Sequence, residues 1–119
     1  MKNFTQKELE KIRNGVESDM QRYPEHVTLD DIRQWLLDNV GTRSVRGHNT
    51  YHIKHLIERD YGKERGQKMC YCANNWVKYV VVEMGIRVRK YMRVDGGVKY
   101  FPQPTHENVL DNSVNYIFA

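Results

Sequence analysis

The spacing of apolar residues changes at Gly85, and this change restricts the folds open to the second half of the chain. Before Gly85, from about residue 67 to residue 84, apolar side chains recur every three or four positions, which is typical of a helix. After it, apolar and basic residues alternate with one interruption at Lys90, as on a strand with one buried face. We therefore predict a helix followed directly by an antiparallel hairpin over residues 86–101, which turns at the Asp-Gly-Gly sequence of residues 95–97.

Three earlier segments also have helical spacing, and each begins at a residue suited to cap a helix. Thr5 and Glu8 form a capping-box pattern, and Thr28 is followed closely by two aspartates. The predicted helices cover about residues 5–22, 28–40, 50–61 and 68–84. We expect a mainly α fold with a small β-hairpin, and a core that contains Trp35, Leu36, Ile53, Leu56, Trp76, Val80 and Ile86.

Length and composition limit the class of protein. The chain has 119 residues, of which 39% are hydrophobic and 29% charged, and this favours one globular domain over a disordered chain. Its uninterrupted apolar runs, such as residues 79–82, are far shorter than the ~20 residues of a membrane span. The N-terminus becomes charged within seven residues, and two cysteines cannot form a disulfide framework. We expect a soluble, cytoplasmic protein that has no membrane partner.

Positive charge is concentrated in the middle of the chain. The formal net charge is +4, but residues 42–99 carry 13 basic and 5 acidic side chains. Residues 1–41 and 100–119 each have a net charge of −2. Clustered lysines and arginines produce a field that attracts phosphate groups, although the same charges also suit an ordinary solvated surface.

Two sequence blocks mark the passage from the last helix into the hairpin. They are WVKYVVVEMGI at residues 76–86 and the basic segment RVRKYMRVDGGVKYF at residues 87–101. Coming after three helices, they resemble the winged helix-turn-helix family of DNA-binding domains. The resemblance covers about residues 27–102, with residues 1–26 as an N-terminal helical extension and residues 103–119 as an apolar C-terminal tail. The long third core helix with its run of valines departs from the family pattern.

The resemblance implies that the third core helix enters the major groove of DNA and that the hairpin, or wing, contacts the backbone. Asparagine can pair with adenine, and lysine can reach phosphate or guanine. The polar face of that helix comprises Lys68, Tyr71, Asn74, Asn75 and Lys78. The wing supplies phosphate contacts from Arg87, Arg89, Lys90, Arg93 and Lys99. A phosphate clamp would come from the loop and cap before the second core helix, with Arg43, Arg46 and Asn49.

This interpretation predicts a duplex-DNA-binding protein, such as a small transcriptional or replication regulator. The competing interpretation of the helix residues is the solvated side of an amphipathic helix, and for the wing it is a charged edge that prevents strand pairing. Winged-helix folds also bind proteins, so the alternative function is an interaction module that modulates a nucleic-acid-processing or host defence complex, of the kind that phages or mobile elements encode. Basic residues on one continuous face would favour DNA, whereas an exposed apolar patch would favour a protein.

The sequence also contains residues of the types that bind zinc or carry out catalysis. His52, His55, Cys70 and Cys72 could supply zinc ligands, but Cys-x-Cys on a helix directs its sulfurs about 200° apart. We therefore expect buried cysteines and no metal. No catalytic motif is present, because capping explains Asp30 and Asp31 and an exposed helix face explains Glu58 and Asp60, so we expect neither enzyme activity nor a cofactor.

The two ends of the chain offer surfaces for packing or for partners. An apolar stripe on the first helix comprises Leu9, Ile12, Val16 and Met20. This stripe either forms a homodimer seam or packs on its own domain. The C-terminal tail is too apolar for a solvated end, so we expect it to dock on the core or on a partner.

Overall fold

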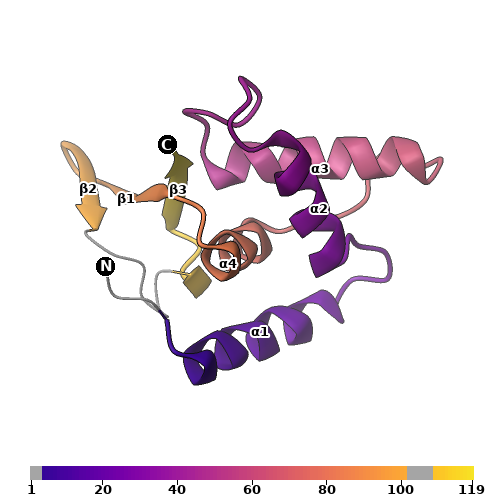
Figure 1. Ribbon diagram of the computed structural model, residues 1–119, viewed down its shortest axis with the longest axis horizontal. Coiled ribbons are helices and arrows are strands. Elements are labelled where there is room, and N and C mark those ends of the chain that lie inside the picture. Colours follow the sequence, from indigo (N-terminus) through magenta and orange to yellow (C-terminus); the bar gives the residue numbers. More distant parts are fainter. Residues whose placement is uncertain (1–3, 102–108) are drawn as a thin grey trace.

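The chain folds into four helices and one three-stranded antiparallel sheet (Figure 1). The computed structural model describes residues 4–101 and 109–119. Within these ranges the elements are α1 (Gln6–Met20), α2 (Leu29–Asn39), α3 (Thr50–Glu64), α4 (Asn74–Met84), β1 (Val88–Val94), β2 (Gly97–Phe101) and β3 (Val114–Phe118). No helix in these ranges is both long and apolar enough to cross a membrane.

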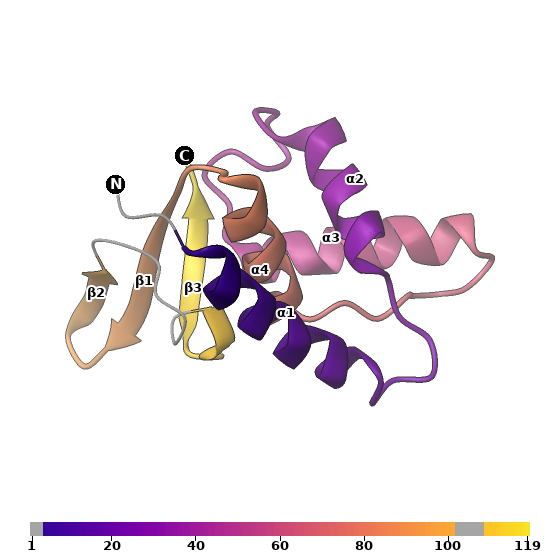
Figure 2. The ribbon, with the colours of Figure 1, turned by 60° about the horizontal axis from the view of Figure 1, so that its bottom comes forward.

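Helix α4 lies at the centre of the molecule. In the view of Figure 1, α1 lies below α4, whereas α2 and α3 lie above it. Figure 2 shows the sheet at one end of this helical body, with β3 next to α4. Every side chain of α4 from Trp76 to Val81 is buried. Burial on all sides explains how a helix rich in valine, which has a low helix propensity, is stable here.

The predicted helix starts are confirmed by their capping hydrogen bonds. At α1, the Glu8 N–H donates to the Thr5 hydroxyl at 3.1 Å, and the Thr5 N–H donates to the Glu8 carboxylate at 2.9 Å. Thr28 and Asp31 make the same reciprocal pair at α2, with distances of 3.0 and 2.9 Å. Asn49 caps α3. These caps satisfy N–H groups that the first turn of a helix leaves without intrahelical partners.

The start of α4 differs from the prediction, because the helix begins at Asn74 rather than near residue 68. The residues before it bond elsewhere and stay extended. The Cys70 N–H donates to the Glu58 carbonyl at 3.1 Å, and the Cys72 N–H donates to the Glu58 carboxylate at 3.2 Å. The carbonyl of Tyr71 accepts from an N–H of the chain before α2. Glu58, expected on an exposed helix face, is instead only 3% exposed, because it serves these donors.

The hairpin forms as predicted, with β1 and β2 paired from Lys90 opposite Phe101 to Val94 opposite Gly97. At its turn Gly96 has a φ of +84°, in the left-handed region that favours glycine. The alternation along β1 is not interrupted at Lys90. This side chain faces the helices and is 8% exposed, so it occupies a core-facing position. Because lysine is charged, the sequence pattern alone made this position look like a break in the alternation.

The third strand comes from the C-terminal segment. β3 pairs antiparallel with β1 on the edge opposite β2, and Val114, Tyr116 and Phe118 are buried. The chain just before α3 continues the sheet, because Asn49 forms an antiparallel bridge with Ile117. Residues 109–119 of the expected tail thus dock on the core, and the rest of that tail lies outside the described residues.

The apolar stripe of α1 packs inside its own chain. Ile12, Val16 and Met20 are buried in the same core as α4, and Leu9 is partly buried against it. The stripe is therefore covered within one copy of the chain and presents no seam to a second copy. The expected N-terminal extension shares its core with the expected winged-helix domain.

The predicted core is confirmed at most of its positions. The residues that are buried as expected are Trp35, Leu36, Ile53, Trp76 and Val80. Leu56 and Ile86 are only partly buried, although both pack against the core. Periodicity identified the inward faces of the helices, but it did not predict how deeply residues near the edge of such a face are buried.

Lys78 joins the centre of α4 to the C-terminal segment. Its side chain is fully buried, and its ammonium group donates to the carbonyls of Asp111 and Val114 at 2.7 Å each. Burial lowers the pKa of Lys78 to about 8. The side chain is therefore part of the core, although it carries a charge at neutral pH.

The role of Lys78 can be tested against Lys68, the other lysine of the predicted DNA-reading helix face. Lys78→Ala leaves a cavity and two carbonyls without their donor, so we expect it to lower the free energy of unfolding by about 2–5 kcal/mol. Lys68 is exposed, and Lys68→Ala should change that free energy by no more than about 0.5 kcal/mol. Chemical denaturation followed by circular dichroism measures both; similar small losses would show that Lys78 is not a structural residue.

Candidate nucleic-acid interface

The expected DNA-reading face of α4 is used inside the molecule. Lys78 is buried, and the Asn74 amide donates to the Asn115 side chain at 2.7 Å. The Asn75 amide donates to the Leu110 carbonyl at 3.0 Å. The expectation that Lys78 and Asn74 face solvent is therefore wrong, because the segment that includes β3 covers this face of α4, where Asn75 is half-buried. The apolar character of the tail was the one sequence signal of this cover.

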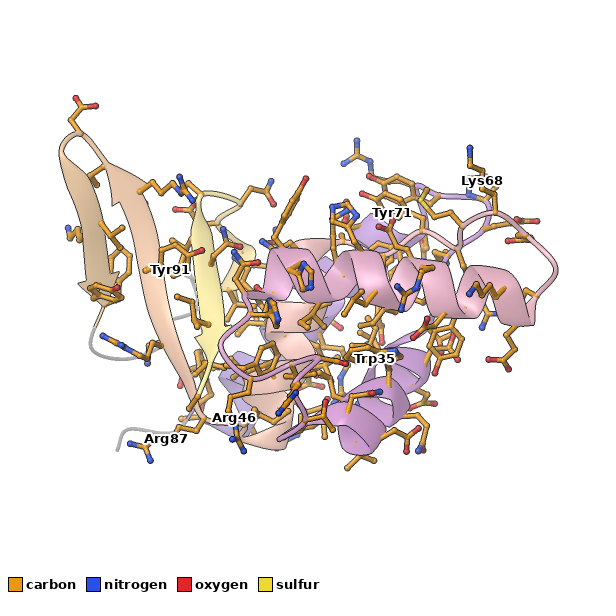
Figure 3. All side chains as sticks on the ribbon, turned by 90° about the horizontal axis from the view of Figure 1, so that it is seen from above. Trp35, Arg46, Lys68, Tyr71, Arg87 and Tyr91 are labelled. Carbon is orange, nitrogen blue, oxygen red and sulfur yellow. The ribbon has the colours of Figure 1, made fainter. Side chains whose placement is uncertain are left out.

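The other two residues of that predicted face lie outside α4. The Tyr71 ring stacks on Tyr23 with centroids 4.0 Å apart, and its hydroxyl donates to the Tyr23 hydroxyl at 3.2 Å. Burial and this hydrogen bond raise the pKa of Tyr71. Lys68 is exposed, but Figure 3 shows it at the end of the molecule away from the hairpin. The five residues predicted on one helix face are thus not brought together.

Two wing arginines lie together on the outer face of the sheet, which is the face turned away from α4. Register places Arg89 and Arg93 on this face with Tyr91 between them. Both arginines are exposed. The Arg89 guanidinium lies 4.8 Å from the ring centroid of Tyr100, which is 52% exposed. This face therefore presents cations beside an accessible aromatic ring.

The two wing lysines point to the other side of the sheet. Lys90 stands opposite the buried Tyr116, and burial lowers the pKa of Lys90. Lys99 stands opposite Met92 and shares that side, with its ammonium 5.4 Å from the ring centroid of Phe101. The expectation that Lys90 contacts phosphate is wrong, because register with β3 turns it toward the core.

The arginines of the loop and of the wing meet at one end of β3. Arg46 and Arg87 are both exposed, and Figure 3 shows them near the same end of the sheet. The Gly47 N–H donates to the Phe118 carbonyl, and the Ala119 N–H donates to the Arg87 carbonyl. The two segments therefore flank the end of β3, which places their backbones about 10 Å apart. Arg43 is exposed in the same loop.

The Asn49 side chain is hydrogen-bonded within the fold and is not available to bind phosphate as predicted. Its side-chain oxygen accepts from the His52 N–H at 2.8 Å, and its amide nitrogen donates to the Tyr91 hydroxyl at 2.9 Å. Both ends of the amide are therefore occupied. Tyr91, which the sequence marked only as a wing residue, in this way fixes the start of α3 against the outer face of the sheet.

Three histidines lie at this junction. The rings of His48 and His52 stack with centroids 4.3 Å apart, and His55 lies one turn further along α3. Burial lowers the pKa of His52, and the nearby His48 and His55 lower it further. Because its pKa is lowered, His52 gains its positive charge only at a lower pH than an ordinary histidine. The sequence had suggested His52 and His55 only as zinc ligands.

The cysteines are buried, as predicted. Burial and then the carboxylate of Glu58 raise the pKa of the Cys72 thiol, which makes it a poor nucleophile. Among the described residues, no group of three or more His, Cys, Asp or Glu side chains is placed to hold a metal ion.

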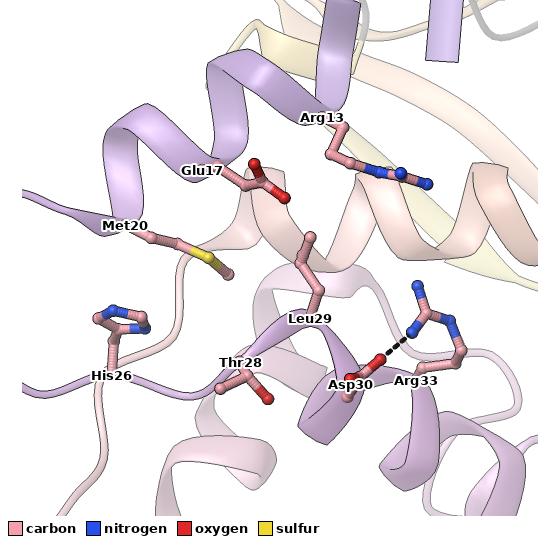
Figure 4. A pocket seen from close by; sticks show the side chains of 8 residues that line it. All are labelled: Arg13, Glu17, Met20, His26, Thr28, Leu29, Asp30 and Arg33. Carbon is pink, nitrogen blue, oxygen red and sulfur yellow. Dashed lines mark hydrogen bonds and ion pairs between the residues drawn. The ribbon is translucent and has the colours of Figure 1, made fainter. Parts of the chain in front are cut away.

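A groove of about 410 Å³ lies between α1 and α2, but its arginines are already paired (Figure 4). Arg13 donates to the Glu83 carboxylate at 3.0 Å, and Arg33 donates to the same group at 2.9 Å and also pairs with Asp30. Burial raises the pKa of Glu83, but hydrogen bonds from Tyr79 and both arginines outweigh it and hold the pKa below its ordinary value. These arginines therefore join α1 and α2 to α4 and leave the groove without a free cationic pair.

Comparisons with known protein families, curated proteins and solved structures each find no match to this chain. The placement of its own side chains is therefore the basis for assigning a function.

The histidine cluster gives a prediction for titration by NMR. His48→Gln removes a neighbouring positive charge and a stacked ring from His52, so the pKa of His52 should rise toward its ordinary value. The Cε1–H chemical shift of His52 followed from acid to neutral pH measures this change. An unchanged or lower pKa in the variant would show that His48 does not set the titration of His52.

Proposed function

We propose that this protein binds duplex DNA, and that the outer face of its sheet holds the phosphate backbone. Arg89 and Arg93 project from the same exposed face, and Arg87 and Arg46 lie at its end. Guanidinium groups pair with phosphate through charge-assisted hydrogen bonds, often two at a time.

The distribution of charge supports this role. Residues 85–101 carry five basic side chains and one acidic side chain, and residues 43–55 carry three basic side chains and no acidic one. These two segments adjoin across β3. By contrast, residues 4–38, which contain α1 and most of α2, carry five basic and eight acidic side chains. A field of one sign on one side of a protein attracts a polyanion to that side.

We interpret the arrangement as a variant of the winged-helix fold, in which α2, α3 and α4 lead into the β1–β2 wing. The wing keeps its role in backbone contact. The role of α4 changes, because residues 109–118 cover the face that would otherwise read bases. We propose a binding role and no catalysis, since the arginines of this face contact phosphate without needing a reactive group.

The wing arginines should act through counterion release. In Arg89→Ala/Arg93→Ala, binding to a short mixed-sequence duplex should weaken, and the slope of log affinity against log salt should flatten by roughly 0.9 for each lost contact. Fluorescence anisotropy between about 50 and 200 mM salt measures both quantities.

A matched control comes from the opposite side of the molecule. Arg22 follows α1, and its side chain is 75% exposed. Arg22→Ala should leave both the affinity and the slope nearly unchanged. A wild-type protein that binds no duplex at low salt, or that binds the corresponding single strand more tightly, would contradict the proposed function.

A further inference from the structure

We infer that α3, rather than α4, is the helix that enters the major groove, through a stripe formed by Tyr51, His55, Arg59 and Lys63. This inference rests on the proposed binding of duplex DNA and identifies the helix that contacts the bases. It assigns a base-reading surface to residues that the fold leaves exposed.

The stripe lies on one face of α3 because its members are four residues apart. Tyr51 is 52% exposed, the side chains of His55 and Arg59 are 52% and 58% exposed, and Lys63 is exposed. On the opposite side of the helix, Ile53 and Ile57 are completely buried. α3 has 15 residues and is therefore about 22 Å long, so a full side of it is available to a partner.

The stripe begins where the outer face of the sheet ends. The Asn49–Tyr91 hydrogen bond and the Asn49–Ile117 bridge join the start of α3 to that face. Figure 3 shows α3 in front of α4 and beside β3, in the view that looks onto the sheet. Figure 1 shows α3 on the side of α4 opposite α1. A duplex held by the arginines of the sheet would therefore lie next to α3.

The chemistry of the stripe suits base edges in a major groove, which is about 12 Å wide and admits one helix. Arginine and lysine pair with guanine O6 and N7, whereas histidine and tyrosine can donate to base acceptors. Arg59 donates to Asp60 at 3.2 Å, but this surface ion pair is weak and can be exchanged for a base. The stripe contains no aliphatic side chain, and its cationic and aromatic groups are complementary to the phosphates and base edges of DNA.

The test compares two short duplexes of one mixed sequence. One is unmodified, and in the other every cytosine is replaced by glucosylated 5-hydroxymethylcytosine, which fills the major groove but leaves the phosphates and minor groove unchanged. We expect the wild-type protein to bind the modified duplex at least about tenfold more weakly, measured by fluorescence anisotropy at low salt.

Variants of the stripe complete the test. Arg59→Ala/Lys63→Ala should weaken binding to the unmodified duplex by about tenfold. The control, Lys7→Ala/Lys11→Ala, removes two exposed cations at the same spacing from α1 and should change affinity less than about twofold. Thermal melts by circular dichroism establish that both variants are folded.

The outcomes separate this inference from the proposed function. If the wild-type protein binds both duplexes equally well, and only Arg89→Ala/Arg93→Ala weakens binding, the sheet alone holds DNA and the inference about α3 is wrong. If the wild-type protein binds neither duplex, the proposed function fails and the inference fails with it.

Discussion

The arrangement around α4 depends on the buried ammonium group of Lys78. A charge removed from water is costly unless nearby polar groups satisfy it, and here two carbonyls of the C-terminal segment do so at 2.7 Å. This contact places β3 against α4, and β3 in turn pairs along β1, so the hairpin is held in position. Near the C-terminal end of α4, the Glu83 carboxylate accepts hydrogen bonds from Arg13 of α1 and Arg33 of α2. One central helix thus carries a buried cation and a partly buried anion, each satisfied by a different part of the chain.

This use of α4 explains where cations remain available on the surface. The polar residues of α4 are occupied by partners within the fold, so they contribute to stability and not to a surface. In β1, the neighbours Arg89 and Lys90 point to opposite faces of the sheet. Pairing with β3 turns Lys90 toward the buried Tyr116 and turns Arg89 outward. Exposed cations therefore remain on the outer face of the sheet, in the loop before α3 and along α3.

Glu58 links the core to the exposed side of α3. Its carboxylate accepts the Cys72 N–H and lies 3.0 Å from Nδ1 of His55 and 3.5 Å from the ammonium of Lys54. The same residue therefore keeps the chain before α4 extended and orients a histidine of the proposed base-contacting stripe. A carboxylate this deeply buried requires such partners, because they replace the water that it loses on burial.

Local sequence is enough to predict the elements that depend on neighbours a few residues apart. The capping pairs at Thr5 and Thr28, the inward faces of the helices and the turn at Gly96 all follow from local hydrogen bonding, helical period and backbone sterics. Which polar side chains are buried depends instead on the tertiary structure, because the Lys78 ammonium and the Glu58 carboxylate bond to groups distant in the chain, and Lys90 stands opposite the buried Tyr116 across a strand pair. For the same reason the candidate site could be predicted only in part. The outward direction of Arg89 and Arg93 follows from the two-residue period of a strand. The covering of α4 by residues 109–118 follows from long-range packing that no local pattern encodes. Because α4 is covered, α3 is the helix that remains exposed.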